Sequence, residues 1–274
     1  MSTGFWRDSA GIRLSDREAL DRFAAAKVVL LGESHDRAAD HLWQADVIRA
    51  VNRAVSRAAI RVPGARGGVA VGLEMLPWTA QPALDAFVAG DLAFAGLLAE
   101  VRWAEVWGFD PALYQPIFNA CRTERLPIFG LNVARPLVKL VRHEGWGALP
   151  AAERAWLSPA APASSAYRAY LFAMTGGARP DRAAKSPGDP AFDSFVRAQQ
   201  VWDRAFACRL KTARNRDPAR LAIGIVGRGH LEYGHGVPAQ LRDLGIGGVV
   251  VALPGARDVV PGEGPIADLV WEIG

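Results

Sequence analysis

The stretch VVLLGESHDRAADHLWQADVI, residues 28–48, carries the pattern from which the fold is inferred. It overlaps an apolar run, Lys27 to Leu31, that lacks helical spacing and ends at a glycine, as a buried strand does. Apolar residues then recur at helical spacing from Leu42 to Ala58. The stretch therefore predicts a buried strand followed by a helix.

The same alternation recurs along the chain. Four further apolar runs predict buried strands, and segments between them have helical spacing. This order favours the α/β class, with a mostly parallel twisted sheet and helices on both faces. The further strands are expected at Val69–Leu73, Pro127–Leu131, Leu221–Val226 and Gly248–Leu253, and further helices at Pro82–Ala89 and Leu113–Cys121.

One region interrupts this alternation. Residues 146–216 contain no convincing strand, and their helical patterns are separated by the segment GGARPDRAAKSPGDP. We interpret the region as a helical insertion or cap over one end of the sheet, with residues 1–145 and 217–274 as the α/β core domain. Its helices are expected at Ala152–Leu157, Tyr167–Met174 and Phe192–Lys211.

Composition excludes several classes of protein. The 274 residues are 50% hydrophobic and 22% charged, which is the balance of a globular chain and not of a disordered or collagen-like one. Two cysteines, Cys121 and Cys208, are too few for a disulfide framework or a cysteine metal cluster. The formal charge of +4 comes from basic residues scattered among acids, so we expect no nucleic-acid partner.

The beginning of the chain and its apolar runs bear on location. The first twenty residues have no apolar signal region, and no early cysteine offers a lipid-anchor site. The longest apolar runs have the length of strands, far short of the roughly 20 residues of a membrane-spanning helix. We therefore expect a soluble, cytoplasmic protein without a membrane span.

Polar side chains follow four of the predicted strands. Glu33 and His35 follow the first strand, Glu74 the second, Asn132 the third and His230 the fourth. Ligands of open parallel sheets bind outside the carboxyl ends of the strands, so we expect these side chains to share one crevice. A single Glu or His at such a place is more often structural than functional, and the prediction depends on their joint placement.

Charged groups crowded in such a crevice suit acid/base or metal chemistry. His35, Glu74 and His230 together are a suitable ligand set for a divalent metal ion, held from separate strands because the chain has no His-Glu-x-x-His helix. The chain also has no GxSxG motif of serine hydrolases. The nucleotide-binding motifs GxxxxGK[ST] and GxGxxG are absent as well, which disfavours nucleotide binding.

Trp78, Trp103, Trp107 and Tyr114 form a second cluster in the sequence. Trp103 and Trp107 are four residues apart and share a helical face. One interpretation is packing against the sheet. The other is a flat apolar cavity for a large planar ligand.

Four motifs follow one another along the chain: residues 28–48, GVAVGLEMLPWTAQPALDAFVAG at 68–90, the Trp103 and Trp107 pair with FDPALYQPIFNACRTERLPIFGLNVAR at 109–135, and VGRGHLEYGHGVPAQL at 226–241. They resemble the motifs of the ChaN haem-binding uptake family, from about Phe5 to Leu253 and only loosely over residues 146–216. The family is associated with haem binding and iron uptake in bacteria, often as a surface lipoprotein.

The resemblance also implies a site. The superfamily includes erythromycin-esterase-like hydrolases and the Tiki and TraB proteins, some of them metal-dependent peptidases. Its members share a Gly-Glu-x-His type motif, a Glu after the next strand and a late Gly-x-His, which correspond here to Glu33, His35, Glu74 and His230. Asn132 and Arg135 match an Asn-x-x-Arg-like stretch, and His41 with Gln44 matches the first helix.

Haem iron is held by His, Tyr, Met or Cys, and arginines pair with its propionates. Arg135 and Arg228 are the candidates for the propionates. The candidates for the iron are Tyr233, His235 and Tyr114, with His41 and His230 behind them. The cofactor-binding residues that we expect are Tyr114, Asn132, Arg135, Tyr233, His235 and His41.

Three functions follow as hypotheses. The first is haem or iron binding at the carboxyl ends of the strands. The second is a metal-dependent or acid/base hydrolase of an ester or amide, in which Glu33 or Glu74 is the general base and His35 and His230 bind metal or polarise oxygen. The third is an interaction module without chemistry. Whether the protein is an enzyme stays open; the expected partner is a small molecule, and a homodimer is kept open.

Overall fold

The computed structural model describes residues 4–60, 68–178, 181, 183–216, 221–255 and 264–273 of the chain. The strands are β1 Gly4–Asp8, β2 Arg13–Leu14, β3 Val28–Glu33, β4 Val69–Pro77, β5 Ile128–Asn132, β6 Leu221–Gly227, β7 Val249–Pro254 and β8 Leu269–Ile273. The α-helices are α1 Asp16–Ala25, α2 Ala38–Ile60, α3 Gln81–Ala89, α4 Phe94–Glu100, α5 Trp103–Val106, α6 Pro111–Thr123, α7 Arg135–Glu144, α8 Ala151–Arg154, α9 Ser165–Met174, α10 Asp193–Asn215 and α11 Val237–Asp243.

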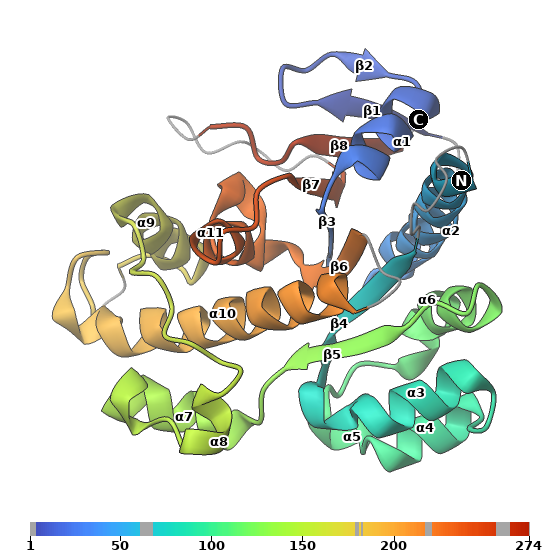
Figure 1. The fold of residues 1–274 in the computed structure, drawn as a ribbon. Helices are drawn as coiled ribbons and strands as arrows, with labels where there is room; N and C mark the ends of the chain where they lie inside the picture. The colour runs from blue at the N-terminus through green and yellow to red at the C-terminus, as the bar shows by residue number, and fades with distance from the viewer. Residues whose placement is uncertain are drawn as a thin grey trace.

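The described strands form one sheet in the order β2-β1-β8-β7-β3-β6-β4-β5 (Figure 1). Neighbouring strands from β8 to β5 are parallel, whereas β1 pairs antiparallel with both β2 and β8. The predicted α/β class is therefore confirmed, and the five predicted strands correspond to β3 through β7. The sequence patterns did not predict β1, β2 and β8, which form one side of the sheet.

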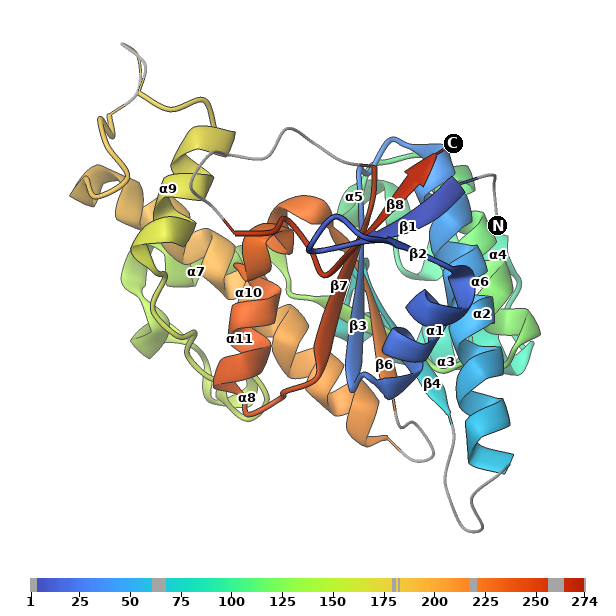
Figure 2. The same ribbon diagram turned by 90° about the horizontal axis from the view of Figure 1, so that it is seen from above.

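Successive residues of the central strand β3 pack on opposite faces of the sheet. Val29 and Leu31 belong to the core under α1, α2, α3, α4 and α6. Val28 and Leu30 belong to the core under α7, α10 and α11. Because both faces are covered, β3 is apolar at consecutive positions and does not alternate with polar residues. Figure 2 shows the two helical layers on either side of the sheet.

The described part of residues 146–216 contains helices and no strand. The long helix α10 packs along the sheet, against β4, β5 and β6. Helix α9 lies farther out, on the side of α10 and α11 (Figure 2). The prediction placed these helices over one end of the sheet, whereas the longest of them, α10, packs along one face. The proposed boundaries of a separate helical unit stay a prediction. None of the described helices is both long and apolar enough to cross a membrane.

The centre of the sheet brings distant parts of the sequence together. Strand β6 lies between β3 and β4, and its register places Gly227 beside Glu33. Strand β4 changes its register against β5 between Leu73 and Pro77, and Glu74 lies within this irregular segment. Such irregularities re-aim side chains at strand ends. The carboxyl ends of β3, β6 and β4 therefore converge at one edge.

Candidate functional site

A cavity of about 540 Å³ opens at the carboxyl ends of these strands. Its lining includes four of the five strand-end residues singled out from the sequence: His35, Glu74, Asn132 and His230. The aromatic side chains of Trp107, Phe109 and Trp202 and the two arginines Arg102 and Arg135 also line it. The structure thus brings the expected polar residues together beside apolar walls. Glu33, the fifth, lies fully buried behind His35.

His35 is held by its partner at the end of β3. Its Nδ1 lies 2.6 Å from Oε1 of Glu33, whose side chain is 0% exposed, whereas 34% of the His35 side chain is exposed. Burial favours the neutral imidazole, but Glu33 outweighs it and raises the pKa of His35. The rings of Trp107 and Phe109 lie 4.8 and 5.2 Å from the imidazole. The ring is therefore fixed, and Nε2 is its nitrogen that is left for a ligand.

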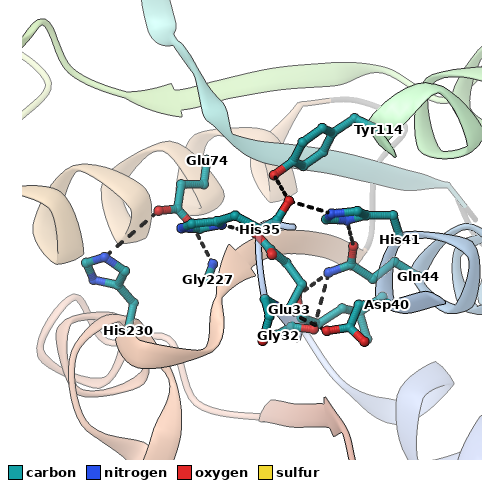
Figure 3. A network of polar contacts seen from close by, with 12 residues as sticks. Gly32, Glu33, His35, Asp40, His41, Gln44, Glu74, Tyr114, Gly227 and His230 are labelled. Carbon is teal, nitrogen blue, oxygen red and sulfur yellow. Dashed lines mark hydrogen bonds and ion pairs between the residues drawn. The ribbon is translucent and has the colours of Figure 1, made fainter. Parts of the chain in front are cut away.

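The backbone of His35 is supported from behind the cavity (Figure 3). The Tyr114 hydroxyl donates to the His35 carbonyl oxygen at 3.2 Å, and Nε2 of His41 lies 3.3 Å from the same atom. Nδ1 of His41 lies 3.1 Å from Oε1 of Gln44, whose amide donates to the carbonyl of Leu31. Tyr114 and His41 are buried and outside the cavity lining. Both contact the loop that carries His35.

Glu74 lies between the two histidines of the cavity (Figure 3). Its Oε1 is 3.9 Å from Nε2 of His230, and its Oε2 accepts a hydrogen bond from the backbone N–H of Gly227. Burial raises the pKa of Glu74 above its ordinary value, against the opposing effects of His230 and His35. A Cβ atom on Gly227 would lie 2.8 Å from Cε1 of His35 and 3.4 Å from Oε2 of Glu74. Glycine at this position lets His35 and Glu74 approach each other.

His230 has its own buried carboxylate. Nδ1 of His230 lies 2.6 Å from Oδ1 of Asp203, and Oδ2 of Asp203 accepts a 2.6 Å hydrogen bond from the Tyr167 hydroxyl. Burial opposes the charged ring, but Asp203 and Glu74 outweigh it and raise the pKa of His230 to about 9. At neutral pH His230 is therefore an imidazolium ion paired with Asp203.

Asp203 was not predicted from the sequence as a site residue, although the spacing of residues on its helix gave an indication. Val196, Asp203 and Leu210 are seven residues apart on α10, share one face of the helix and are all buried. An acid at a position of an apolar stripe indicates a buried partner, because an unpaired buried charge is costly. The identity of that partner depends on tertiary contacts between α10 and the loop after β6.

The remaining predicted cofactor-binding residues divide by location. Asn132 lines the cavity and holds β4, because its amide donates to the Glu74 carbonyl oxygen at 2.8 Å. Arg135, at the start of α7, lines the cavity from an exposed position. Tyr233 and His235 are outside the lining and pack against the ring of Tyr170, with ring centroids 5.7 and 5.8 Å away.

The aromatic cluster expected from the sequence is only partly at the cavity. Trp107 lines it, whereas Trp103 is buried in the core with its indole N–H bonded to the Phe109 carbonyl. Trp78 packs against Trp156, with ring centroids 5.6 Å apart. The packing interpretation thus describes Trp103 and Trp78, whereas Trp107 lies at a cavity wall and its contact with a planar ligand stays a prediction. Phe109 and Trp202, which the sequence patterns did not single out, complete the aromatic wall.

The divalent metal site expected from His35, Glu74 and His230 is not supported. Among the described residues, no group of three or more His, Cys, Asp or Glu side chains is arranged to hold a metal ion. The 3.9 Å between Nε2 of His230 and Glu74 is the length of a loose ion pair. Each of the three side chains is instead oriented by a partner of its own: His35 by Glu33, His230 by Asp203 and Glu74 by the backbone N–H of Gly227.

Comparisons with known proteins agree with this architecture. A family model described as "Haem-binding uptake, Tiki superfamily, ChaN" matches residues 19–241. No curated protein matches the chain at a significant level.

Among solved structures, the fold is similar to that of ChaN from Campylobacter jejuni, a structure described as showing cofacial haem binding. The two chains are 20% identical and superpose with a TM-score of 0.73, over 98% of this chain and 96% of that chain. The type III effector HopBA1 is similar at 10% identity with a TM-score of 0.50, over 93% of this chain and 90% of that chain. At these identities the likeness concerns the fold alone.

Proposed function

Because this chain belongs to the ChaN family of haem-binding uptake proteins in the Tiki superfamily, we propose that it binds haem in the cavity at the carboxyl ends of β3, β6 and β4. The cavity volume of about 540 Å³ is in the range of small-molecule sites. Trp107, Phe109 and Trp202 offer apolar surfaces for a flat macrocycle.

The observation that carries the proposal is the state of His35. Its Nδ1 is bound to Glu33, and its Nε2 has no hydrogen-bond partner among the described residues. A carboxylate accepts a hydrogen bond from Nδ1–H, so Nε2 is the nitrogen of this ring that can give up its proton and bind iron. An imidazole whose other ring nitrogen is hydrogen-bonded to a carboxylate is a standard iron ligand. We therefore assign His35 as the iron ligand.

The other candidates for the iron fit less well. His230 lines the cavity, but its Nδ1 is held by Asp203 and its Nε2 faces Oε1 of Glu74 at 3.9 Å. Tyr114, His41 and Tyr233 lie outside the lining, as does His235. Tyr114 and His41 instead fix the backbone of His35.

Two exposed arginines suit the propionates of haem. Arg102 and Arg135 line the cavity and reach solvent, where carboxylates can meet them with little loss of hydration. Arg228, the other arginine considered from the sequence, is buried in an ion pair with Glu232 and is outside the lining. The propionates are therefore assigned to the mouth of the cavity.

The test is a titration of the purified protein with ferric haem. We expect a saturable Soret shift for the wild type, and His35→Ala to lose the histidine-ligated spectrum and to weaken affinity at least about tenfold, the loss of roughly one strong interaction. His143→Ala is the matched control, because His143 is exposed on α7 and outside the cavity. No shift at micromolar haem contradicts the proposal.

A second candidate function, acid/base hydrolysis of an ester or amide, is favoured by the pair of His–carboxylate contacts around Glu74. In this reading His35, backed by Glu33, takes a proton from water, and the His230 cation stabilises the developing oxyanion. Glu33 is too deeply buried to meet water itself. An ester and amide panel with Glu33→Gln and Glu74→Gln tests it: activity that survives both substitutions contradicts this mechanism.

Location and assembly stay predictions. No helix in the described part of the chain is long and apolar enough to cross a membrane. The cytoplasmic location and the homodimer need fractionation and light scattering. Haem binding as proposed here uses residues of one chain and does not depend on either outcome.

A further inference from the structure

Helix α7 has one side in the core and one side in water. Val138 and Val141 are buried in the core that α7 shares with α10. The exposed basic side chains of the helix are Arg135, Lys139, Arg142 and His143. Residues 135, 139 and 142 are four and three positions apart, so they share one face of the helix, about 10 Å long. We call these three residues the basic face of α7; the helix lies at the outside of the molecule beside α10 (Figure 1).

The basic face has no carboxylate of its own chain to balance its charge. Within the described residues, none of its three cations forms an ion pair. Over residues 134–155, all of them described, the exposed acid is Glu144, whereas Arg154 adds a further exposed cation. By contrast, Arg49 on α2 pairs with Asp46, three positions earlier on the same helix. The positive charge of α7 is therefore left for a partner outside the chain.

The charge at the start of α7 opposes the stability of the helix. Arg135 is in the first turn, where the helix dipole disfavours a cation, and this turn holds no acid. The N-cap residue Ala134 has no side chain that can accept from the free backbone N–H groups. Both features cost stability, and both add positive potential at this end of the helix. Ala134 and Arg135 also line the cavity, whereas Lys139 and Arg142 do not, so the basic face leads from the cavity to the outside.

The basic face fits a protein better than a lipid bilayer or a nucleic acid. Interfacial helices bury an apolar side in the lipid, but the apolar side of α7 is in the core, and Leu137 and Leu140 are half-buried. The exposed side of α7 carries no aromatic ring on which a base could stack. Cations about one helical turn apart match the carboxylates of an acidic protein segment, which arginine binds through two parallel hydrogen bonds. The chemistry of the face is therefore complementary to an acidic protein.

We propose that the basic face of α7 is a docking surface for an acidic segment of a partner protein. Carboxylates of the segment bind Arg135, Lys139 and Arg142 in place of the missing acids of the chain itself. A segment docked in this way has one end at Arg135 and therefore borders the cavity. Docking uses charges on one helix and requires no haem, so it goes beyond the proposed function and does not rest on it.

The experiment uses the purified chain without haem and a fluorescein-labelled peptide of about 20 residues, long enough to form a helix. Glutamates in the peptide recur at spacings of four and three positions, and a reference peptide has glutamine in their place. The test variant combines Lys139→Glu and Arg142→Glu, because neither residue lines the cavity. The matched control combines Arg53→Glu and Arg57→Glu, which reverse two exposed cations one turn apart on α2, also outside the lining. Fluorescence anisotropy measures the affinities.

We expect the wild type to bind the glutamate peptide saturably, and less tightly at higher salt. Binding to the Lys139→Glu, Arg142→Glu variant should be at least about tenfold weaker, while the α2 control keeps the wild-type affinity. A peptide with lysine in place of glutamate should bind this variant more tightly than the wild type, because the charges are exchanged. Lys139→Ala with Arg142→Ala, which suits an exposed helix, should also weaken binding of the glutamate peptide and replaces the first variant if that one does not fold.

Three outcomes overturn the proposal. One is the same affinity of the wild type for the glutamate and glutamine peptides. Another is an equal loss in the α7 and α2 variants, which is the general attraction of a basic protein for an anion. The third is tighter binding of a DNA oligonucleotide or of phosphatidylserine vesicles than of the glutamate peptide, lost in the same α7 variant, which assigns the face to a nucleic acid or a membrane.

Haem binding is measured separately in the same variants. Lys139 and Arg142 lie outside the cavity lining, so Soret titration of the Lys139→Glu, Arg142→Glu variant should match that of the wild type. A failure of docking and a failure of haem binding are thereby distinguished.

Discussion

Glu33 and His35 are two positions apart at the end of β3, and their side chains meet at 2.6 Å. His35 lies in the turn that directly follows the strand, so the contact joins two residues that are close along the chain. The first member of the pair is the last residue of the buried strand, and the second is beyond it in the cavity lining. The strand thus ends with a buried charge behind an accessible imidazole.

The pKa of His230 predicts how stability depends on pH. Its folded pKa of about 9 is above the unfolded value of about 6.5, so this contribution is complete below pH 6.5 and is lost as the pH rises through 9. The shift corresponds to about 3 kcal/mol at most. Urea unfolding of the wild type and His230→Gln at pH 7 and pH 10 measures it. The difference in unfolding free energy between the wild type and His230→Gln should be smaller at pH 10 than at pH 7. An equal difference at both pH values contradicts the prediction. His143→Gln, the control, should unfold with the same free energy as the wild type at both pH values.

Asp203→Asn should lower the pKa of His230. The substitution keeps the size of the side chain and removes the charge that stabilises the imidazolium at 2.6 Å. A fall of more than one pH unit is expected, because a close buried charge shifts a pKa by about 1–3 units. NMR titration of the imidazole protons reports it. Tyr167→Phe removes only a hydrogen bond to Asp203, so a larger shift in that variant is inconsistent with this account.

Gly227→Ala should damage the site through sterics alone. The new methyl group would stand 2.8 Å from Cε1 of His35, which forces that ring to move. We expect a loss of stability of about 1–3 kcal/mol, typical of overpacking, and weaker haem binding. Chemical unfolding and Soret titration measure the two effects. Gly147→Ala is the control, since its methyl group would meet no atom within 4 Å, and equal behaviour of the two variants argues against the crowding.

Arg135→Ala should weaken haem binding by about tenfold, the effect of losing one charge-assisted hydrogen bond worth roughly 1.5 kcal/mol. The same titration with the dimethyl ester of haem, which has no carboxylates, should show no difference between wild type and variant. Arg57→Ala, on the exposed side of α2, is expected to bind as the wild type does. If the ester and the acid respond alike to Arg135→Ala, the propionates do not contact this residue.

The interior of the sheet was predictable because its strands are apolar on both faces. Val28 to Leu31 are consecutive buried residues, and no helical pattern can explain such a run. Strands β1 and β2 escaped prediction for the opposite reason: β2 has two residues, and β1 has one buried residue among half-buried ones. Their pairing depends on the distant β8, which local patterns do not reveal.

The polar residues at strand ends were predictable as a group, because topology alone places those ends together. His35, Glu74, Asn132 and His230 all line the cavity. The direction of an individual side chain was not predictable in this way. Tyr114 and His41 point to the backbone of His35, and this orientation arises from the packing of α2 on α6. The spacing of residues on α10 indicates that Asp203 is buried, but it does not indicate that His230 is its partner. The place of Phe109 at the cavity likewise depends on tertiary contacts.

The position of β6 in the sheet also determines at what point of synthesis the sheet can be completed. The strand that separates β3 from β4 is synthesised more than 140 residues after both of them, as their numbers 28–33, 69–77 and 221–227 show. Until it arrives, the growing chain exposes two facing, apolar strand edges that invite wrong pairing. Nascent chains stalled before residue 221 should therefore depend on chaperones, and release of the completed chain should end that dependence.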